Sequence, residues 1–286
     1  MSDYIKQNSV VNQFDNSNSW VLLSSIEKSI KEKIEKVGTP LKDWNIQIYR
    51  GILTGHNEAF IISTEKRNEI LDNCKDDAEK KRTEEIIRPI LRGRDIKRYS
   101  YDWAGLYIIA TFPSRHYDIE QYPALKAYLL TFGKQKLAQT GEKNINGIKD
   151  NNARKRTNNK WFETQDSISY WDDFAKPKII YAEIVQSPRF FLDKNGEFYP
   201  EATSFIMTGE HLEYLEKFFN SKVGFYLFKT FYAGGELGDK GCRYKKQFLE
   251  KLPIPKPFKD SDNISDDDLI KMYGLTKQES EIILSQ

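Results

Sequence analysis

The chain interleaves short apolar segments with amphipathic stretches, and this alternation constrains its fold most. Apolar runs of about four to eight residues rich in β-branched and aromatic side chains are typical of strands. The stretch SSIEKSIKEKIEKVG instead repeats an apolar residue every third or fourth position from Ile26 to Val37, which predicts an amphipathic helix ending at Gly38. The sequence therefore predicts a mixed α/β (α+β) fold. The strand-like segments are NIQIYR, AFIIS, LYIIATF, PKIIYAEI, PRFFLD and TSFIMT.

Two glycine-containing connections suggest tight turns between these strands. In IYRGILTGHNEAFII, Gly51 and Gly55 separate two apolar runs, and the spacing matches neither a P-loop nor a dinucleotide-binding loop. We therefore expect a hairpin in which both glycines take positive φ. The Asn-Gly pair of LDKNGEFY predicts a second hairpin.

Several other stretches are expected to be helical. TEKRNEILDNC is expected to form a helix begun by the cap candidate Ser63 or Thr64. AEKKRTEEIIRPILRGRDI is expected to form a helix interrupted at Pro89. YPALKAYLLTFGKQKL and the aromatic stretch His211–Tyr232 are expected to form longer helices. In the C-terminal tail, Ser265 and the aspartates after it predict a short capped helix hairpin.

Basic residues are concentrated in the middle of the chain, although the net charge of the 286 residues is only +2. The segment 88–98 has five basic residues and one acidic residue, and the segment 134–160 has eight basic and two acidic residues. The polar stretch GEKNINGIKDNNARKRTNN is expected to form a mobile basic loop. This distribution suits a polyanion partner, although a charge run can also be a solvated face.

Composition and motifs argue against several other classes. The chain has no apolar run long enough to span a membrane and no signal-peptide core, so a cytoplasmic location is expected. The cysteines and histidines are isolated from one another in sequence, so we expect neither a metal site nor a Cys/His nucleophile pair. These isolated residues are Cys74, Cys242, His56, His116 and His211.

The usual catalytic signatures are missing from the sequence. There is no G-x-S-x-G, H-E-x-x-H, kinase loop or Walker pair, and no Asn/Asp-Pro-Pro-Tyr/Phe stretch of an amino-group methyltransferase. A divergent metal-dependent nuclease stays open as an alternative, with Asp172, Asp173 and Glu183 as carboxylates beside Lys178. The same acidic residues are equally compatible with a simple helix-end cluster.

The order of six segments resembles the TaqI-like C-terminal specificity domain, over roughly residues 40–257. This family supplies the target recognition domain of adenine-N6 DNA methyltransferases and type IIG restriction-modification enzymes, and it is related to type I specificity subunits. The six segments are IYRGILTGHNEAFII, IIRPILRGRDIKRY, YPALKAYL, KPKIIYAEI with PRFFLDKNGEFY, FFNSKVGFYLF and FLEKLPIPKP.

The resemblance implies a twisted mixed sheet surrounded by helices, with helical segments at both ends of the chain. It suggests a leader and helix at 1–39, a DNA target recognition domain at 40–257 and an acidic helical tail at 258–286. We expect a free-standing or excised specificity module that is not itself an enzyme. Its expected partners are double-stranded DNA and a methyltransferase or endonuclease domain, which would hold the S-adenosylmethionine and Mg²⁺. An interaction module that mimics a specificity subunit is a further alternative.

A recognition domain needs Lys and Arg to neutralise phosphates and a few polar side chains to read base edges. We expect Arg154, Lys155 and Arg156 to contact phosphates and Asn158, Asn159 or a nearby Gln to read bases. The aromatic candidates Tyr99, Tyr101, Trp103, Trp161 and Trp171 are compatible with core and rim packing, which is the simpler interpretation, or with base stacking. The predicted DNA-binding residues are Arg50, Thr54, Asn57, Arg92, Arg94, Lys97, Arg98, Lys149, Arg154, Lys155, Arg156, Asn158, Asn159 and Lys160.

Overall fold

A computed structural model describes residues 23–233, 241–257 and 264–285. The leader 1–22, the glycine-rich residues 234–240 and the start of the acidic tail lie outside the described residues. The chain forms two compact units: the first comprises 1–46, 184–189 and 209–286, and the second comprises 47–183 and 190–208. The functional division at residues 40 and 257 stays a prediction. The mixed α+β class is confirmed.

The first sheet of the second unit is built around a fully buried strand. β8 (Lys178–Ala182) lies between β10 (Phe190–Asp193) and β12 (Ser204–Gly209), and both neighbours are antiparallel to it. β2 (Ile46–Arg50) completes the order β10-β8-β12-β2. The near-continuous apolar sequence of β8 follows from this position, because a strand paired on both sides and covered on both faces exposes no side chain to water.

The second sheet has the order β11-β4-β7-β3. β4 (Ile87–Leu91) contains Pro89 and is a strand. The helix predicted over this stretch forms only up to Ile86, as α5, so its continuation to Pro89 and beyond is wrong. β11 pairs only with the last two residues of β4, so at Pro89 β4 has a neighbour on one side alone, where proline is tolerated. The other strands are β3 (Ile61–Ser63), β7 (Leu106–Ile109) and β11 (Tyr199–Pro200).

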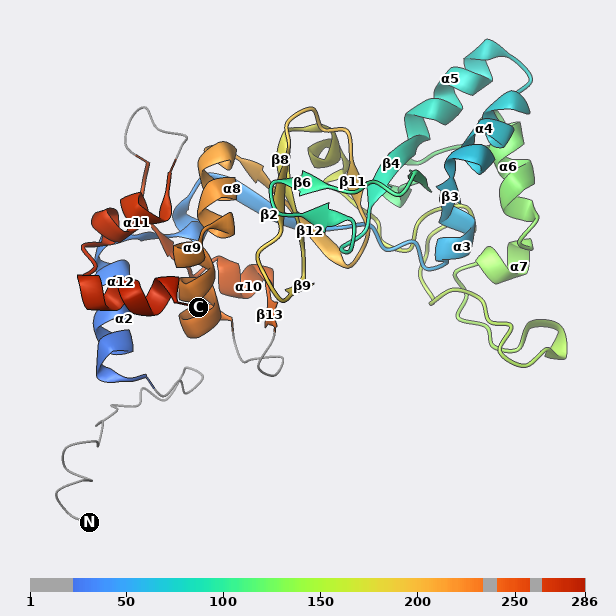
Figure 1. Ribbon diagram of the computed structural model, residues 1–286. Helices are drawn as coiled ribbons and strands as arrows, with labels where there is room; N and C mark the ends of the chain where they lie inside the picture. The colour runs from blue at the N-terminus through green and yellow to red at the C-terminus, as the bar shows by residue number, and fades with distance from the viewer. Residues whose placement is uncertain (1–22, 234–240, 258–263, 286) are drawn as a thin grey trace. The chain divides into compact units, whose positions relative to one another are not determined.

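Helices pack against this second sheet around one hydrophobic cluster. Phe60, Ile86, Ile109 and Leu125 are among its buried members. Helix α4 begins at its predicted cap, Ser63, and contacts both α5 and α6, which lie beside it in Figure 1. The helices are α3 (Asn57–Phe60), α4 (Thr64–Asp72), α5 (Asp77–Ile86), α6 (Pro123–Leu130) and α7 (Lys134–Leu137).

Short elements complete the second unit. β5 (Ile96–Lys97) and β6 (Ser100–Tyr101) form a small antiparallel ribbon. The 3₁₀ turns are η2 (Pro113–Arg115), η3 (Ile119–Gln121), η4 (Ile145–Gly147) and η5 (Trp171–Ala175).

Neither predicted glycine hairpin forms. β2 and β3, on either side of Gly51 and Gly55, belong to different sheets, and so do β10 and β11 on either side of Asn195-Gly196. Gly55 does take positive φ (75°), but Gly51 is required for another reason. A Cβ at Gly51 would lie 2.2 Å from the carbonyl oxygen of Glu201, because the two backbones run in contact. Each connection therefore carries the chain from one sheet to the other.

The first unit is mainly helical, with two small antiparallel pairs. The predicted helix 211–232 is broken at Ser221, whose extended backbone ends α8 and whose hydroxyl caps α9. The pairs are β1 (Thr39–Pro40) with β14 (Pro253–Ile254) and β9 (Ile184–Val185) with β13 (Cys242–Arg243). The helical elements are α2 (Ser25–Val37), η1 (Leu41–Asp43), α8 (Leu212–Asn220), α9 (Lys222–Leu227), the π-helical η6 (Phe228–Tyr232), α10 (Lys246–Leu249), α11 (Asp266–Tyr273) and α12 (Lys277–Leu284).

The helices at the two ends of the described chain begin with capping boxes. In α2, α11 and α12 the residue before the helix is a Ser or Thr, and its hydroxyl accepts a hydrogen bond from the backbone N–H of the third helical residue. That third residue is acidic, and its side chain accepts in return from the backbone N–H of the Ser or Thr. Gly274 ends α11 in the left-handed conformation. The predicted amphipathic helix and capped helix hairpin are confirmed. Both α11 and α12 contact α2 (Figure 1).

A buried carboxylate joins α12 to α2. Glu279 accepts from the Lys33 ammonium at 2.6 Å and from the Ser29 hydroxyl at 2.7 Å. Burial raises the pKa of this carboxyl, but hydrogen bonds from Lys33, Thr276 and Ser29 outweigh it and bring the pKa to about 2, from a usual 4.5. The folded protein thus binds the proton less tightly than the unfolded chain does. The stabilisation is present above pH 4.5 and is lost as the pH falls toward 2.

Glu279→Gln is expected to lower the free energy of unfolding at pH 7 by roughly 1–3 kcal/mol, because it removes a charged acceptor and leaves Lys33 without a counter-ion. Urea unfolding followed by circular dichroism between pH 2 and 7 measures this, and the variant should lose less stability than the wild type on acidification. Glu281→Gln, an exposed position on the same helix, is the control. Equal pH profiles for the wild type and Glu279→Gln would contradict the assignment.

Among the described residues, the helices lack the combination of length and apolar character needed to span a membrane.

Candidate nucleic-acid interface

The predicted basic loop folds back on itself as a hydrogen-bonded ribbon. Its two antiparallel segments are joined by backbone hydrogen bonds from Arg154 to Ala138 (3.0 Å), from Ala153 to Glu142 (2.9 Å) and from Ile145 to Asn151 (2.7 Å). We call residues 138–157 the basic ribbon. Since these bonds join the two segments, the expectation that this stretch is too polar to pack is wrong. The stretch is a loop as predicted, and its mobility stays a prediction.

Arg154 anchors the basic ribbon from the inside. Its side chain is 3% exposed, and its guanidinium donates to the carbonyl oxygens of Leu137, Thr54, Glu163 and Trp161 at 2.7–2.8 Å. Burial lowers its pKa to about 10, which still leaves it charged at neutral pH. Because its donors are turned toward buried carbonyls, the structure contradicts the expectation that Arg154 contacts phosphates.

The loop after β2 lies directly against the basic ribbon. A Cβ at Gly55 would meet Arg154 and Gln165, and the Gln165 backbone N–H donates to the carbonyl of Leu53 at 3.0 Å. Thr54 is fully buried and its hydroxyl is bonded to the Asn57 side chain at 2.6 Å, so Thr54 is not a surface contact as predicted. Asn57 itself is exposed.

Side-chain amides lock the base of the ribbon. Asn159 donates to the carbonyls of Gln165 (3.0 Å) and Thr164 (3.3 Å), and Gln139 donates to the carbonyl of Glu163 (3.1 Å). The amide N–H groups of Asn159 are therefore used internally, contrary to the expectation that they read bases, whereas Asn158 is exposed. The sequence pattern did not single out Gln139 or Gln165, since a buried amide in a polar segment carries no periodic signal.

The remaining basic residues of this region point to the surface. Lys149 lies near the ribbon tip, and Lys155 and Arg156 lie on its returning segment. Lys160 follows the ribbon, with its ammonium 5.5 Å from the centre of the Phe162 ring. Apart from Arg154, the predicted cations of this region are thus exposed side chains on a hydrogen-bonded backbone that fixes their positions.

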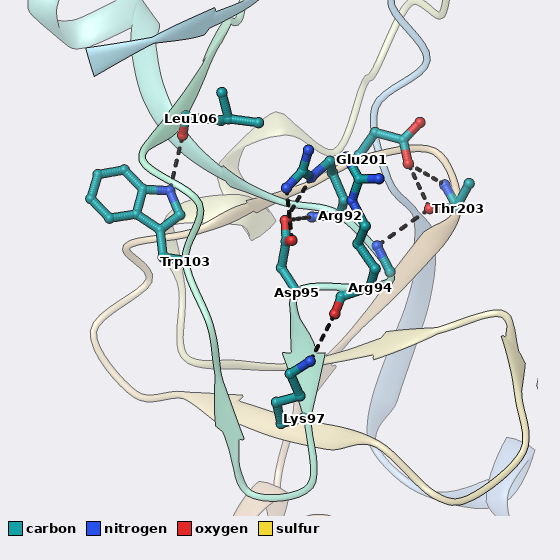
Figure 2. A network of polar contacts seen from close by, with 9 residues as sticks. Arg92, Arg94, Asp95, Lys97, Trp103, Leu106, Glu201 and Thr203 are labelled. Atoms are coloured by element: carbon teal, nitrogen blue, oxygen red, sulfur yellow. Dashed lines mark hydrogen bonds and ion pairs between the residues drawn. The ribbon is translucent and has the colours of Figure 1, made fainter. Parts of the chain in front are cut away.

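A second group of predicted residues gathers around residues 201–203. Arg50 is exposed and donates through Nε to the carbonyl of Ala202 at 3.0 Å. The backbone N–H of Gly93 approaches the Thr203 hydroxyl at 3.4 Å, and that hydroxyl is also bonded to Glu201 (Figure 2). The basic ribbon instead reaches Thr54 through the Arg154 guanidinium. The structure therefore sorts the predicted residues into two groups.

Within the second group, Arg92 is a structural residue. Its guanidinium pairs with both oxygens of the buried Asp95 at 2.8 and 2.9 Å, and its backbone N–H also donates to Asp95 (Figure 2). A bidentate pair with a carboxylate occupies the donors that a phosphate would need. This pairing argues against the prediction that Arg92 binds DNA.

Arg94 and Arg98 are exposed beside Arg92, and Lys97 is partly exposed. The Lys97 ammonium is bonded to the carbonyl of Arg94 at 3.1 Å and lies 3.4 Å from Asp102. The Arg98 guanidinium is 5.2 Å from the centre of the Tyr99 ring. These three cations stay candidates for phosphate contact.

The aromatic candidates also divide into exposed and packed side chains. Tyr99, Tyr101 and Trp103 are exposed, although Tyr101 packs on Phe191 and Phe198. Trp161 packs against the hydrophobic cluster. Trp171 is covered by the guanidinium of Arg115, 3.7 Å from its ring centre, in a contact that the sequence did not reveal.

The carboxylates of the nuclease alternative are not arranged around Lys178. The Lys178 ammonium is fully buried and pairs with Asp193 at 2.7 Å, while Asp173 pairs with Lys176 at 2.9 Å. Within the described residues no three His, Cys, Asp or Glu side chains are placed to hold a metal ion together. The geometry gives the nuclease alternative no support.

The family description "TaqI-like C-terminal specificity domain" matches residues 88–254, more than half of the chain. The chain belongs to this family. The match confirms the family resemblance, although it begins at residue 88 and leaves out the first of the six segments, residues 48–62. It covers both the β5–β6 ribbon and the basic ribbon.

Similar proteins come from restriction-modification systems. A type II methyltransferase, M.PaeR7I of Pseudomonas aeruginosa, is 24% identical over 244 residues, which cover 83% of this chain and 37% of that protein. The type IIG restriction endonuclease BpuSI has a TM-score of 0.50 at 12% identity, covering 92% of this chain and 28% of that one; this likeness concerns the fold. The type IIL restriction-modification enzyme MmeI, solved in complex with DNA, has a TM-score of 0.49 at 9% identity, covering 87% of this chain and 34% of that one. The chain thus spans well under half of each relative.

Proposed function

We propose that this specificity domain binds double-stranded DNA and directs a methyltransferase or endonuclease to particular sequences. The proposal rests above all on the basic ribbon, in a chain that belongs to the specificity-domain family. Its exposed cations are held by a fixed scaffold of buried hydrogen bonds around Arg154. Positively charged groups fixed in position supply the phosphate contacts that orient a protein on a duplex.

In this proposal the two groups of residues act together. Lys149, Lys155, Arg156 and Lys160 contact phosphates, and Asn158 is the exposed amide that reads a base edge. Arg50, Arg94, Lys97 and Arg98 form the second set of contacts. Each mismatched base pair would cost on the order of 1–3 kcal/mol of binding free energy.

The catalytic chemistry belongs to the partner in this proposal. A methyltransferase partner would hold S-adenosylmethionine and the flipped adenine, and a nuclease partner would hold Mg²⁺. The residues of this chain contribute the difference in binding free energy between right and wrong sequences.

The charge contribution is testable without knowing the target sequence. In Lys155→Ala/Arg156→Ala, DNA affinity should fall for all sequences, and the slope of log K against log salt should become shallower by about 2, because each lost phosphate contact removes about 0.9 from it. Fluorescence anisotropy with a labelled duplex pool at several salt concentrations measures both quantities.

Lys28→Ala/Lys42→Ala removes two exposed lysines of the first unit and is the matched charge control. Its slope should stay closer to the wild-type value. An unchanged slope in Lys155→Ala/Arg156→Ala would show that the basic ribbon does not contact DNA. A wild-type chain that binds no duplex at low salt would overturn the proposed function.

A further inference from the structure

The tip of the basic ribbon presents an isoleucine to solvent. Ile148 is 58% exposed, the largest value among the exposed large hydrophobic side chains of the described residues. Ile145, three residues earlier, is 3% exposed and fixes the same turn from the inside. The exposed isoleucine is therefore not explained by packing of the turn.

Backbone and side-chain hydrogen bonds hold the turn at the tip. Ile148 donates its backbone N–H to the carbonyl of Ile145 (3.2 Å), and its own carbonyl accepts from Asn151 (3.2 Å). The Asn144 side chain accepts from the Asp150 N–H at 3.0 Å. Asn144, Asn146, Gly147 and Asp150 all take positive φ, which suits Gly and Asn and is tolerated by Asp. The local sequence thus specifies one conformation that holds Ile148 outward.

The shape and charge of the ribbon suit the major groove of DNA. The major groove admits a pair of extended segments such as a two-stranded β-ribbon, and the basic ribbon has two antiparallel segments joined by backbone hydrogen bonds, although neither segment is a regular strand. Lys149 stands next to Ile148, and Lys155 and Arg156 follow on the returning segment. These cations would meet the phosphates on the groove walls as the tip enters.

We propose that the basic ribbon enters the major groove tip first and that Ile148 contacts the 5-methyl group of a thymine. This inference rests on the proposed function and adds a base contact to it. The thymine methyl is the apolar group that base pairs present in the major groove, so it is the partner that an aliphatic side chain can distinguish. The cations around Ile148 favour a polyanion over an apolar protein surface as the occupant.

A thermodynamic cycle tests the contact without a known target. Duplexes that the wild-type chain selects from a random pool are amplified once with thymidine triphosphate and once with deoxyuridine triphosphate. The second product differs from the first only in lacking the 5-methyl groups of thymine. The wild type should bind the thymine form about fourfold more tightly, the equivalent of one buried methyl group. For Ile148→Ala the ratio of the two affinities, thymine form to uracil form, should fall to about 1. Effects of the missing methyls on DNA shape are common to both proteins and cancel in the comparison.

Two variants sharpen the result. Ile148→Val keeps branched methyl groups, so its preference for the thymine form over the uracil form should stay close to that of the wild type. Ile184→Ala removes another isoleucine, 54% exposed, outside the ribbon, and should leave the ratio unchanged. An equal ratio in the wild type and Ile148→Ala overturns the contact.

Failure of this inference and failure of the proposed function give different results. If the wild type selects no duplexes, the proposed function fails. If it selects duplexes and Ile148→Ala binds both forms as the wild type does, the proposed function stands and Ile148 has another role. Loss of association with a catalytic partner in Ile148→Ala, with DNA affinity and ratio intact, would show that the tip contacts protein and would likewise overturn the inference.

Discussion

Arg154→Ala is expected to lower the free energy of unfolding by roughly 3–5 kcal/mol, one of the two largest single-residue effects that we predict. The substitution removes a donor from four carbonyl oxygens, those of Leu137, Thr54, Trp161 and Glu163, of which the Glu163 carbonyl keeps a second donor, the Gln139 amide. Each unsatisfied buried acceptor costs about 1–3 kcal/mol, and entry of water into the space left by the side chain keeps the total below the sum. Urea unfolding followed by circular dichroism measures the loss.

Arg154→Lys tests whether charge or geometry matters. A lysine ammonium has no planar fork of donors, so it cannot satisfy four separated carbonyls, and this variant should also be clearly destabilised. Arg156→Ala, two residues along at an exposed position, should change the free energy of unfolding by less than about 0.5 kcal/mol. Equal stability of Arg154→Ala and Arg156→Ala would show that Arg154 is not the anchor of the ribbon.

Asp193→Ala is expected to lower the free energy of unfolding by a similar amount, roughly 3–5 kcal/mol. The variant leaves the fully buried Lys178 with the carbonyl of Phe174 as its acceptor, and it removes the acceptor of the backbone N–H groups of Glu197 and Phe198. Burial already lowers the pKa of Lys178, and loss of the carboxylate lowers it further. Because the unfolded lysine keeps its proton up to about 10.5, the stability of this variant should rise with pH.

The double variant Lys178→Met/Asp193→Asn is the informative comparison. It removes both charges but keeps an oxygen for the two backbone N–H groups, so it should recover most of the stability lost in Asp193→Ala. Chemical unfolding of the two variants between pH 6 and 10 separates the effects. A double variant as unstable as Asp193→Ala, with no dependence on pH, would show that the ion pair is not the source of the loss.

Local signals predicted a large part of the secondary structure. The helix from Ser25 and the C-terminal helix hairpin followed from capping residues and periodic apolar positions, which act within a few residues. The segment around Pro89 and the two glycine turns were misassigned, because which strands become neighbours depends on distant parts of the chain. Pro89 lies in a strand because β4 pairs with β7, and it is tolerated there because β11, more than a hundred residues later, pairs only with residues beyond it.

The candidate site was predicted at the level of segments better than at the level of side chains. The basic segments were found by charge, but charge does not distinguish a surface cation from one that satisfies buried carbonyls. Arg154 and Arg92 were both assigned to DNA and both proved to be engaged inside the fold. Ile148 went unnoticed because a single apolar residue in a polar loop has no periodicity.

The sequence by itself determined the mixed class, the capped helices, the basic middle of the chain and the family, because each of these depends on residues close in sequence or on their order along the chain. Only the tertiary structure decided which cations face solvent. Arg154 and Lys155 are adjacent and both basic, yet one is buried and the other is exposed. The physical reason is that the carbonyls that draw Arg154 inward come from residue 54 and residues 137–163, which approach one another only when the chain folds.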